Sequence, residues 1–409
     1  MKNQLLLIIA VLFSAVTFTT SCQKMMPAGP LDENVLEGTI PGLTPEEENK
    51  HLIGDEAFGK IFSEEEGLGP IFVQTSCSNC HIGDGKGHPS NIVTRFANVT
   101  GAVTDYLIEK GGPQLQNHSV GTYPAETLPS EANVFSNRMA PAVMGLGYVA
   151  ALDDQSILAN ADPDDADGDG ISGRPNYVDA SSFFVPENIN IPNNGKYIGR
   201  FGKKARQVTI QDMAVFALKE DIGITSDFDK EDVYNCNAGM NIGDNVPDPE
   251  VSADFVNDLV FYVRTLQAPP RRNTDDPDVL EGEKLFTQIG CTGCHKPTFT
   301  TAQSDIAALS YQTFHPYSDF LLHDMGPALD DGYPEGGANS YEWRTPPLWG
   351  IGLASDSQGG QMFLLHDGRA STFEDAVSNH GGEAAGRRTA FFSLSPEQRQ
   401  QIIKFLESL

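Results

Sequence analysis

The chain has 409 residues, 39 % of them hydrophobic and 20 % charged, and its formal net charge is −29 at pH 7. This length allows two or three domains. The strongly negative charge excludes nucleic acid and an anionic membrane surface as electrostatic partners, and it permits attraction of a basic protein.

The first 22 residues are predicted to be a lipoprotein signal peptide. A positively charged start precedes the apolar stretch 5–18, which is too short for a comfortable transmembrane helix. Small residues then precede Cys22 as in a bacterial lipobox, although Thr19 stands where leucine is usual. We expect a lipidated Cys22 on the periplasmic side of a bacterial membrane, with a plain secretory signal and a soluble periplasmic protein as the alternative. Residues 23–45, rich in Pro, Gly and acidic side chains, predict a tether.

The first chemical motif follows a predicted helix. Thr44 is placed to cap a helix start, and the Gly-x-x-x-Phe spacing of residues 54–58 puts small and aromatic side chains on one helix face. Cys77, Cys80 and His81 then form Cys-x-x-Cys-His, the spacing for covalent attachment of a c-type haem. The thiols add to the haem vinyl groups and the histidine ligates the iron. A zinc knuckle or a dithiol redox pair is the alternative for a bare Cys-x-x-Cys.

Residues 100–200 are predicted to be a long insertion that is mostly loop, because Gly, Pro and Asn are frequent there. Within it, Asp165, Asp167 and Asp169 alternate around a glycine, as at the opening of a calcium loop. The twelfth position is Asn176 and not glutamate, so a helix-loop-helix hand is not expected. The alternative to a Ca²⁺ site is a solvated acidic turn.

A second copy of the motif, Cys291, Cys294 and His295, again follows a helix-like segment at residues 282–286. Two such pentapeptides in a chain with six cysteines are a specific signal for two covalently bound haem c groups. The proximal ligands of the two irons would be His81 and His295.

Each half of the chain is predicted to end in a helix. Residues 252–266 carry apolar side chains on one helix face, and Ser395 begins a capping-box pattern before the last helix. A stiff, proline-containing break at residues 268–272 separates the halves. We therefore expect a mainly α fold with two cytochrome-c-like helical domains and long loop-rich insertions. The N-terminal haem domain would span 46–270, and the C-terminal haem domain 271–409.

The stretch 343–383 resembles the C-terminal domain of bacterial diheme cytochrome c peroxidases and the related methylamine-utilisation diheme enzymes. It contains Arg-Thr-Pro-Pro-Leu at 344–348 and His-Asp-Gly followed by Thr-Phe-Glu-Asp-Ala-Val at 366–377. In the peroxidases a methionine ligand lies just beyond the second segment, and the matching residue here is His380. The resemblance implies that His380 ligates the second haem, which would lower its potential relative to methionine ligation. Met325 is the alternative ligand.

Nearly the whole mature chain is similar to the di-haem oxidoreductase family, whose members are described as peroxidases and sometimes as thiol oxidoreductases. The matching segments are Ala140-Pro141, 145–147, 161–170, 199–202, 221–225, 323–326, 342–350 and 380–383.

The same resemblance identifies a candidate catalytic carboxylate at the first haem. A peroxidase needs an open iron position and an acid–base group above it. Diheme peroxidases carry that carboxylate after a Gly-Arg-Ala run, and the corresponding segment here contains Asp221, with the adjacent Glu220 as substitute. No clear sixth ligand lies near the first motif, so the first haem is the candidate catalytic site.

Three features depart from the peroxidases. Met213 stands at the position of their distal glutamine, their inter-haem tryptophan is missing, and no histidine immediately precedes Met139, where they carry a removable ligand. Tyr197 or Phe201 is expected in place of the tryptophan. Met139 or Met144 is an alternative ligand for the first iron, although packing against haem is expected for both.

We expect an exported peroxidase that reduces hydrogen peroxide, with electrons from a small redox protein entering at the C-terminal haem and passing to the N-terminal one. One alternative is an electron-transfer cytochrome without a substrate of its own. The other is an oxidase of an organic or protein substrate that acts through high-valent haem. No nucleic acid partner is expected, and the membrane would be contacted only through the lipid anchor.

Overall fold

The structure is a computed structural model that describes residues 34–409. The predicted signal peptide, the lipidation of Cys22 and residues 23–33 of the predicted tether lie outside the described residues. By its contacts, Leu36–Leu409 forms one compact unit. The expected boundary between haem domains near residue 270 stays a prediction within that unit. In the described part of the chain, every helix is too short or too polar to cross a bilayer.

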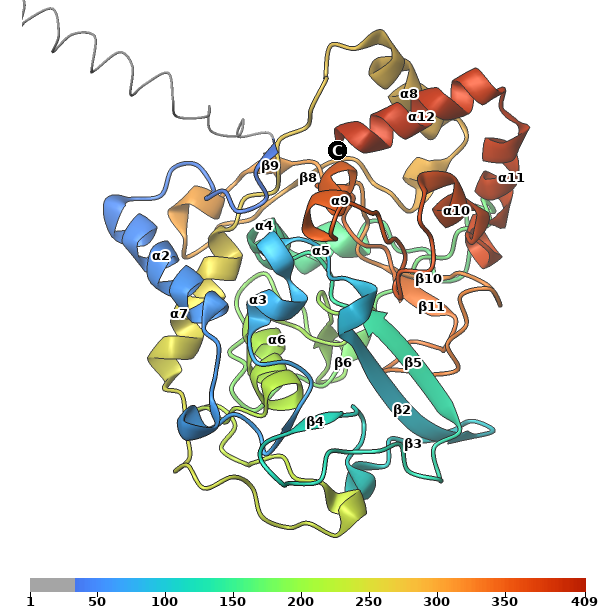
Figure 1. The fold of residues 1–409 in the computed structure, drawn as a ribbon. Helices are drawn as coiled ribbons and strands as arrows, with labels where there is room; N and C mark the ends of the chain where they lie inside the picture. The colour runs from blue at the N-terminus through green and yellow to red at the C-terminus, as the bar shows by residue number, and fades with distance from the viewer. Residues whose placement is uncertain (1–33) are drawn as a thin grey trace, which may run out of the picture. The chain divides into compact units, whose positions relative to one another are not determined.

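In each half, the helix before the Cys-x-x-Cys-His motif crosses the helix that ends the half. α2 (Pro45–Gly59) packs on α7 (Ala253–Thr265), and α8 (Pro277–Gln288) packs on α12 (Pro396–Ser408) (Figure 1). Glycine allows both crossings. A Cβ atom on Gly54 would collide with the carbonyl of Asp258 and lie 2.6 Å from Tyr262 Cβ, and one on Gly282 would collide with the carbonyl of Gln401. The predicted close approach of a crossing helix is confirmed.

The predicted helix starts are confirmed by their caps. The amide of Glu47 donates to Thr44 Oγ1 over 3.3 Å at the start of α2, and the Glu47 side chain accepts from the Thr44 amide over 2.8 Å. At the start of α12 the amide of Gln398 donates to Ser395 Oγ over 3.2 Å, and the Gln398 side chain reciprocates. Because each cap satisfies backbone groups that a helix end leaves free, these local bonds fix where the helices begin.

The largest sheet is formed by strands from the first half of the chain. β2 (Ile92–Thr100) pairs antiparallel with β5 (Val134–Met139) and with β3 (Val103–Asp105), in the order β3-β2-β5. The pair β10 (Leu322–Asp324) and β11 (Glu342–Arg344) lies in the second half (Figure 1). The remaining strands are the antiparallel pairs β1 (Ile71–Phe72) with β4 (His118–Ser119), β6 (Tyr177–Val178) with β7 (Tyr197–Ile198), and β8 (Phe299–Thr300) with β9 (Thr313–Phe314). The shorter helices are α3 (Cys77–Cys80), α4 (Leu146–Ala150), α5 (Asp154–Leu158), α6 (Ile210–Ala217), α9 (Ala354–Ser357), α10 (Phe373–Ser378) and α11 (Ala385–Ser393).

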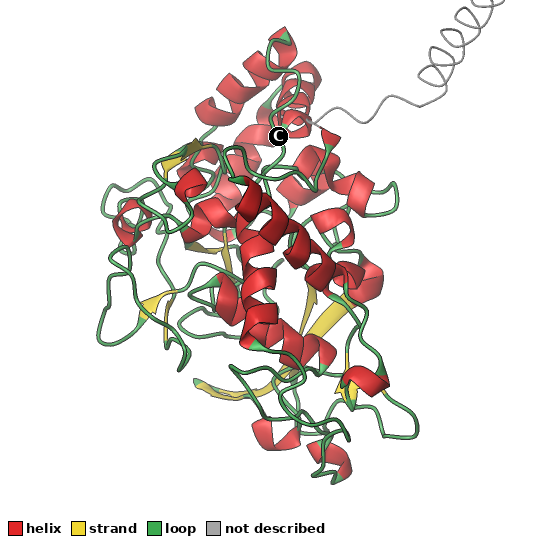
Figure 2. Ribbon diagram, turned by 90° about the vertical axis from the view of Figure 1, so that its left-hand side faces the viewer, coloured by secondary structure: helices red, strands yellow, loops and turns green. Residues whose placement is uncertain are grey.

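The expected fold class, mainly α with two cytochrome-c-like helical domains, is wrong. Helices of every kind make up 34 % of the described residues and strands 14 %, and irregular loops fill much of the rest (Figure 2). The physical reason is clearest in β2. Its nine residues include Ile92, Val93 and Val99 and two threonines, and β-branched side chains of this kind favour an extended backbone.

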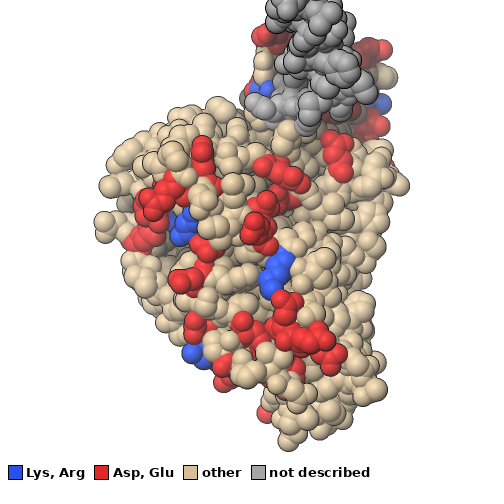
Figure 3. Space-filling model, turned by 60° about the vertical axis from the view of Figure 1, so that its left-hand side comes forward, with Lys and Arg blue, Asp and Glu red and all other residues tan. Residues whose placement is uncertain are grey.

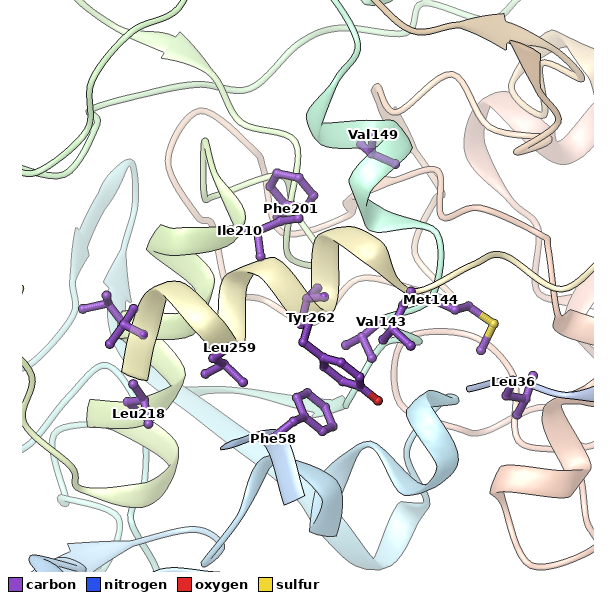
Figure 4. Close-up of a cluster of buried hydrophobic side chains, with 14 of the residues drawn as sticks. Leu36, Phe58, Val143, Met144, Val149, Phe201, Ile210, Leu218, Leu259 and Tyr262 are labelled. Atoms are coloured by element: carbon purple, nitrogen blue, oxygen red, sulfur yellow. The ribbon is translucent and has the colours of Figure 1, made fainter. Parts of the chain in front are cut away.

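Two hydrophobic clusters hold the motifs in place. The larger contains Phe58 of α2, Leu259 and Tyr262 of α7, and Phe201, which Figure 4 shows gathered around α7, and it extends to Trp349 of the second half. The second cluster packs α8 against α12 and α11; its aromatic members are Phe286, Tyr317, Phe373, Phe391 and Phe405. Each motif is therefore backed by a pair of crossed helices with a packed interior.

Candidate haem sites

Both motifs form a tight helical turn that ends at the histidine. Cys77–Cys80 is a single α-helical turn, and Cys291–Gly293 is a 3-10 turn. In each, the histidine amide donates to the carbonyl of the first cysteine over 3.0 Å, His81 to Cys77 and His295 to Cys291. The same backbone hydrogen bond therefore links the histidine to the first cysteine in both motifs.

The two motif histidines are held in the form that binds a metal. Nδ1 of His81 donates to the carbonyl of Pro141 over 2.7 Å, and Nδ1 of His295 donates to the carbonyl of Tyr317 over 2.9 Å. Since a carbonyl can only accept, the proton sits on Nδ1 and the Nε2 lone pair is free for iron. Burial lowers the pKa of both imidazoles to about 4, so both are neutral at physiological pH.

One cavity of about 400 Å³ reaches both motifs. Its walls are mainly apolar and include Phe58, Phe201, Leu348 and Phe391. The volume falls in the range of about 300–1,000 Å³ that is typical of sites for cofactors and small molecules. Paired thiols, imidazoles with a free Nε2 and apolar walls are the donor set and surroundings that haem requires, so the residues present fit two haem groups.

At the second motif, the structure brings His380 to the same cavity as His295. His380 follows α10, and its Nδ1 donates to the carbonyl of Ala376 over 2.7 Å, which leaves Nε2 free. The two imidazoles are close enough that His380 helps to lower the pKa of His295. Met325 also lines the cavity. The hydrogen bond of His380, which matches that of the proximal histidines, favours His380 as the ligand.

At the first motif, the structure brings Asp221 into the cavity. The residue lies on a π-helical turn, Leu218–Ile222, a distortion that is frequent at functional sites. The amides of Val73 and Gln74, just before the motif, donate to its carbonyl over 2.7 and 2.9 Å. Nε2 of Gln114 donates to its Oδ1 over 2.6 Å. Burial raises the pKa of Asp221 to about 6, and the Gln114 bond and the charge of Arg95 oppose that rise.

Glu220, the substitute for Asp221, lies outside the cavity lining. Its Oε2 accepts from Nε2 of Gln116 over 3.2 Å, and the charge of Arg95 acts on it. The pKa of Glu220 is raised by burial. The π-turn therefore directs two adjacent carboxylates to different surroundings, and it is Asp221 that faces the first motif.

The remaining residues named from the sequence divide between the cavity and the surrounding packing. Met213, Met144 and Phe201 line the cavity, whereas Tyr197 packs on Phe184 outside it. Met139 is fully buried outside the lining. Of the two residues expected in place of the tryptophan, Phe201 is thus the one that lines the cavity.

Sequence reasoning missed several residues that meet at this cavity. Trp343 and Trp349 line it although both belong to the second half, and Trp349 Nε1 donates to the carbonyl of Met144 over 3.1 Å. Lys86 and Lys203 line it as well. The sequence contained only a weak signal for these residues. Lys203 directly follows the family segment 199–202, and Trp343 belongs to the segment 342–350. Neighbouring residues in the sequence do not show which cavity these side chains face.

The acidic loop is arranged differently from the prediction. Carboxylate oxygens of Asp162, Asp165 and Asp167 lie within 4.8 Å of one another. Asp169 instead accepts from the amide of Ile171 over 2.8 Å and pairs with Arg387. The structure therefore groups two of the three predicted ligands with Asp162, and Ca²⁺ binding stays a prediction.

Residues 123–409 match the family described as "Di-haem oxidoreductase, putative peroxidase". No curated protein matches the chain. Among solved structures, Kuenenia stuttgartiensis hydrazine synthase pressurised with 20 bar xenon is 14 % identical, with 94 % of this chain and 98 % of that chain covered and a TM-score of 0.38. A likeness this weak carries no argument about fold or function. The family match covers well over half of the chain, spans the second motif and both Asp221 and His380, and accords with a cavity lined by both motifs, so this chain belongs to the di-haem oxidoreductase family.

Proposed function

We propose that the protein is an exported c-type peroxidase that uses its two haems to reduce hydrogen peroxide to water. The thiols of both motifs would be joined to the haem vinyl groups. The proposed iron ligands are His81 at the first haem and His295 with His380 at the second.

The observation that carries the proposal is the inequality of the two sites. The second site has imidazoles on His295 and His380, whereas the first has the imidazole of His81 and the carboxylate of Asp221. Two imidazoles would suit an electron-transfer centre, because both could ligate one iron. An imidazole with a carboxylate suits a catalytic centre, because a position is left for substrate and a proton carrier is at hand.

When bound, the first haem supplies a redox-active iron that binds and reduces peroxide. The protein's contribution is proton movement at Asp221. Gln114 holds Oδ1 over 2.6 Å, so Oδ2 is the oxygen that takes a proton from one peroxide oxygen and returns it to the other. Each peroxide consumes two electrons and two protons and gives two waters. A carboxyl with a pKa of about 6 can both accept and release that proton near neutral pH.

Electrons would enter at the second haem from a small redox protein. The chain's net charge of −29 supports a basic donor, and acidic side chains gather on the face shown in Figure 3 with few basic ones between them. Long-range attraction of this kind raises the rate of encounter and is screened by salt. The proposed location is the periplasmic side of a bacterial membrane, with Cys22 as the lipid anchor.

The test compares Asp221→Asn with Glu220→Gln. Both changes remove a carboxylate from the same π-turn, but only Asp221 lines the cavity. We expect Asp221→Asn to lower peroxide turnover by about 10²–10⁴-fold, the usual contribution of a positioned acid–base group. Glu220→Gln should keep most of the turnover, and both variants should keep two haems as measured by pyridine haemochrome.

The outcomes separate the proposal from its alternatives. Wild-type turnover in Asp221→Asn would refute the role of Asp221. A wild-type protein whose spectra show only six-coordinate, low-spin haem in every oxidation state, and that binds neither peroxide, cyanide nor CO, would refute the peroxidase and favour an electron-transfer protein.

A further inference from the structure

Five basic side chains line the cavity that the two motifs share: Lys86, Lys203, Arg344, Arg387 and Arg388. The first three are close enough that the charges of Lys86 and Arg344 act on Lys203. We call these three the cationic cluster. Lys86 lies on the loop after the first motif, and its carbonyl accepts from Oγ of Ser357 in α9 over 3.1 Å. Lys203 and Arg344 are adjacent in space, because the Arg344 amide donates to the Lys203 carbonyl over 3.0 Å at the end of β11 (Figure 1). The cluster thus joins segments from both halves of the chain.

Among residues 34–409, no carboxylate lies within ion-pair distance of the cationic cluster. Neither lysine ammonium makes a hydrogen bond or ion pair there, and the Arg344 guanidinium donates only to the backbone carbonyls of Gly202 and Thr345. Asp367 attracts both ammonium groups at longer range. Its carboxylate, however, is already paired with Arg369, over 2.6 and 2.7 Å.

Three unpaired cations in an apolar cavity are electrostatically costly. The cost is visible in the pKa values. Burial lowers the pKa of Lys86 to about 7, and burial together with the charges of Lys86 and Arg344 lowers that of Lys203 well below its usual value. Such a cluster is stable in its charged form only if anions enter the cavity beside it.

The anion must fit a cavity that the family fills with two haems. Haem carries two propionate carboxylates, so each haem that enters the cavity brings two anions with it. The cluster spans the two sites. The charge of Lys203 acts on His81. The charge of Asp319, whose amide donates to the carbonyl of Cys294 over 2.9 Å, acts on Arg344.

We propose that the cationic cluster binds haem propionates, with Lys86 and Lys203 serving the first haem and Arg344 the second. This proposal rests on the two haems of the family and on their attachment at the motifs, and not on peroxide reduction. A cation beside a propionate favours the reduced iron, because it offsets the negative charge that reduction adds. Removing it therefore lowers the midpoint potential.

The experiment uses the holoprotein with both haems, and compares Lys86→Gln and Lys203→Gln with Lys196→Gln. The control removes a lysine that pairs with Asp179 on the surface, away from the cavity. Spectroelectrochemical titration gives the midpoint potentials, and resonance Raman gives the propionate bending modes. We expect both cavity variants to lower the potential of at least one haem and to shift those modes, with the haem content and the control unchanged.

Two results would overturn the proposal. The first is wild-type potentials and wild-type propionate modes in both cavity variants. The second is a wild-type potential that varies with chloride or phosphate concentration and loses that dependence in Lys203→Gln, because the cluster would then bind a free anion. If Lys203→Gln does not accumulate with haem, Lys86→Gln is used to test the proposal. Lys203→Arg, which keeps the positive charge, then serves as the variant at position 203. Peroxide turnover is not a readout here, so failure of the peroxidase proposal leaves this result interpretable.

Discussion

Replacing Gln114 with leucine should move the acidic limb of the pH–rate profile without touching a haem ligand. Gln114 is 1 % exposed, and its Nε2 donates to Asp221 Oδ1 over 2.6 Å and to the Glu220 carbonyl over 2.9 Å. Its bond to the carboxylate opposes the rise that burial imposes on the pKa of Asp221. Leucine has a similar size and cannot donate, so Gln114→Leu removes that opposition.

The size of the expected pKa shift follows from the free energy of the hydrogen bond between Gln114 and Asp221. A hydrogen bond to a charged group contributes about 1.5–3 kcal/mol, and one pKa unit corresponds to about 1.4 kcal/mol. The pKa of Asp221 should therefore rise from about 6 by roughly 1–2 units. Proton acceptance requires the ionised carboxylate, so turnover increases as pH rises through this pKa. In Gln114→Leu the increase should occur at higher pH, with the loss of rate greatest in mildly acidic buffer.

The assay is kcat/KM for peroxide across pH with a fixed electron donor. The matched control is Gln116→Leu, because Gln116 is equally buried at 2 % exposure and donates to Glu220 instead of Asp221. Both variants lose a buried amide, so any general effect on stability is shared. An acidic limb that stays in place in Gln114→Leu, or moves equally in both variants, would refute the assignment of that limb to Asp221.

Three further predictions concern the scaffold, the second haem and the anchor. Gly54→Ala should lower the free energy of unfolding of the holoprotein by about 1–3 kcal/mol, because the new Cβ would meet the backbone of α7. The control Gly59→Ala, in the same helix but with nothing within 4 Å of the new Cβ, should not lower it. Equal denaturant midpoints for the two variants would contradict this prediction. His380→Ala should convert one low-spin haem to high-spin without changing the haem content. His380→Met should restore six-coordinate haem, with a higher midpoint potential than in the wild type. An unchanged spectrum in His380→Ala would instead indicate Met325 as the ligand. Cys22→Ala should move the protein from the membrane fraction to the soluble periplasm, and continued fractionation with membranes would exclude the lipid anchor.

Features that depend on near neighbours in the chain were predictable. The capping boxes at Thr44 and Ser395 act over three residues, and the histidine follows the cysteines directly in both motifs. The two glycines before the motifs could also be assigned, because a missing side chain on an inward helix face has few uses other than close packing. In each of these cases the local sequence contains the whole physical cause.

Features that depend on distant partners were not predictable in this way. β2 was overlooked because the high Gly, Pro and Asn content of the insertion dominated the prediction, while the partner of β2, β5, lies beyond a long connection. The cationic cluster needs segments near residues 86, 203 and 344 to meet, which no periodicity reveals. Asp221 was found only through resemblance to peroxidases, and the structure supplies the physical reason that resemblance lacked: a π-turn that directs it toward the first motif.

The two sites share a scaffold and differ in the segment that closes each one. In both, crossed helices with a glycine at the contact support a Cys-x-x-Cys-His turn, and a backbone carbonyl orients the histidine. Over the second site the segment after α10 brings His380, held by its own helix through Ala376. Over the first site the π-turn brings Asp221, held by Gln114 from the insertion. The imidazole can close an iron, while the carboxylate, already bonded through Oδ1, is better placed to carry a proton than to ligate. The proposed division of labour, with electron entry at the second haem and peroxide reduction at the first, would therefore follow from which short segment each scaffold receives.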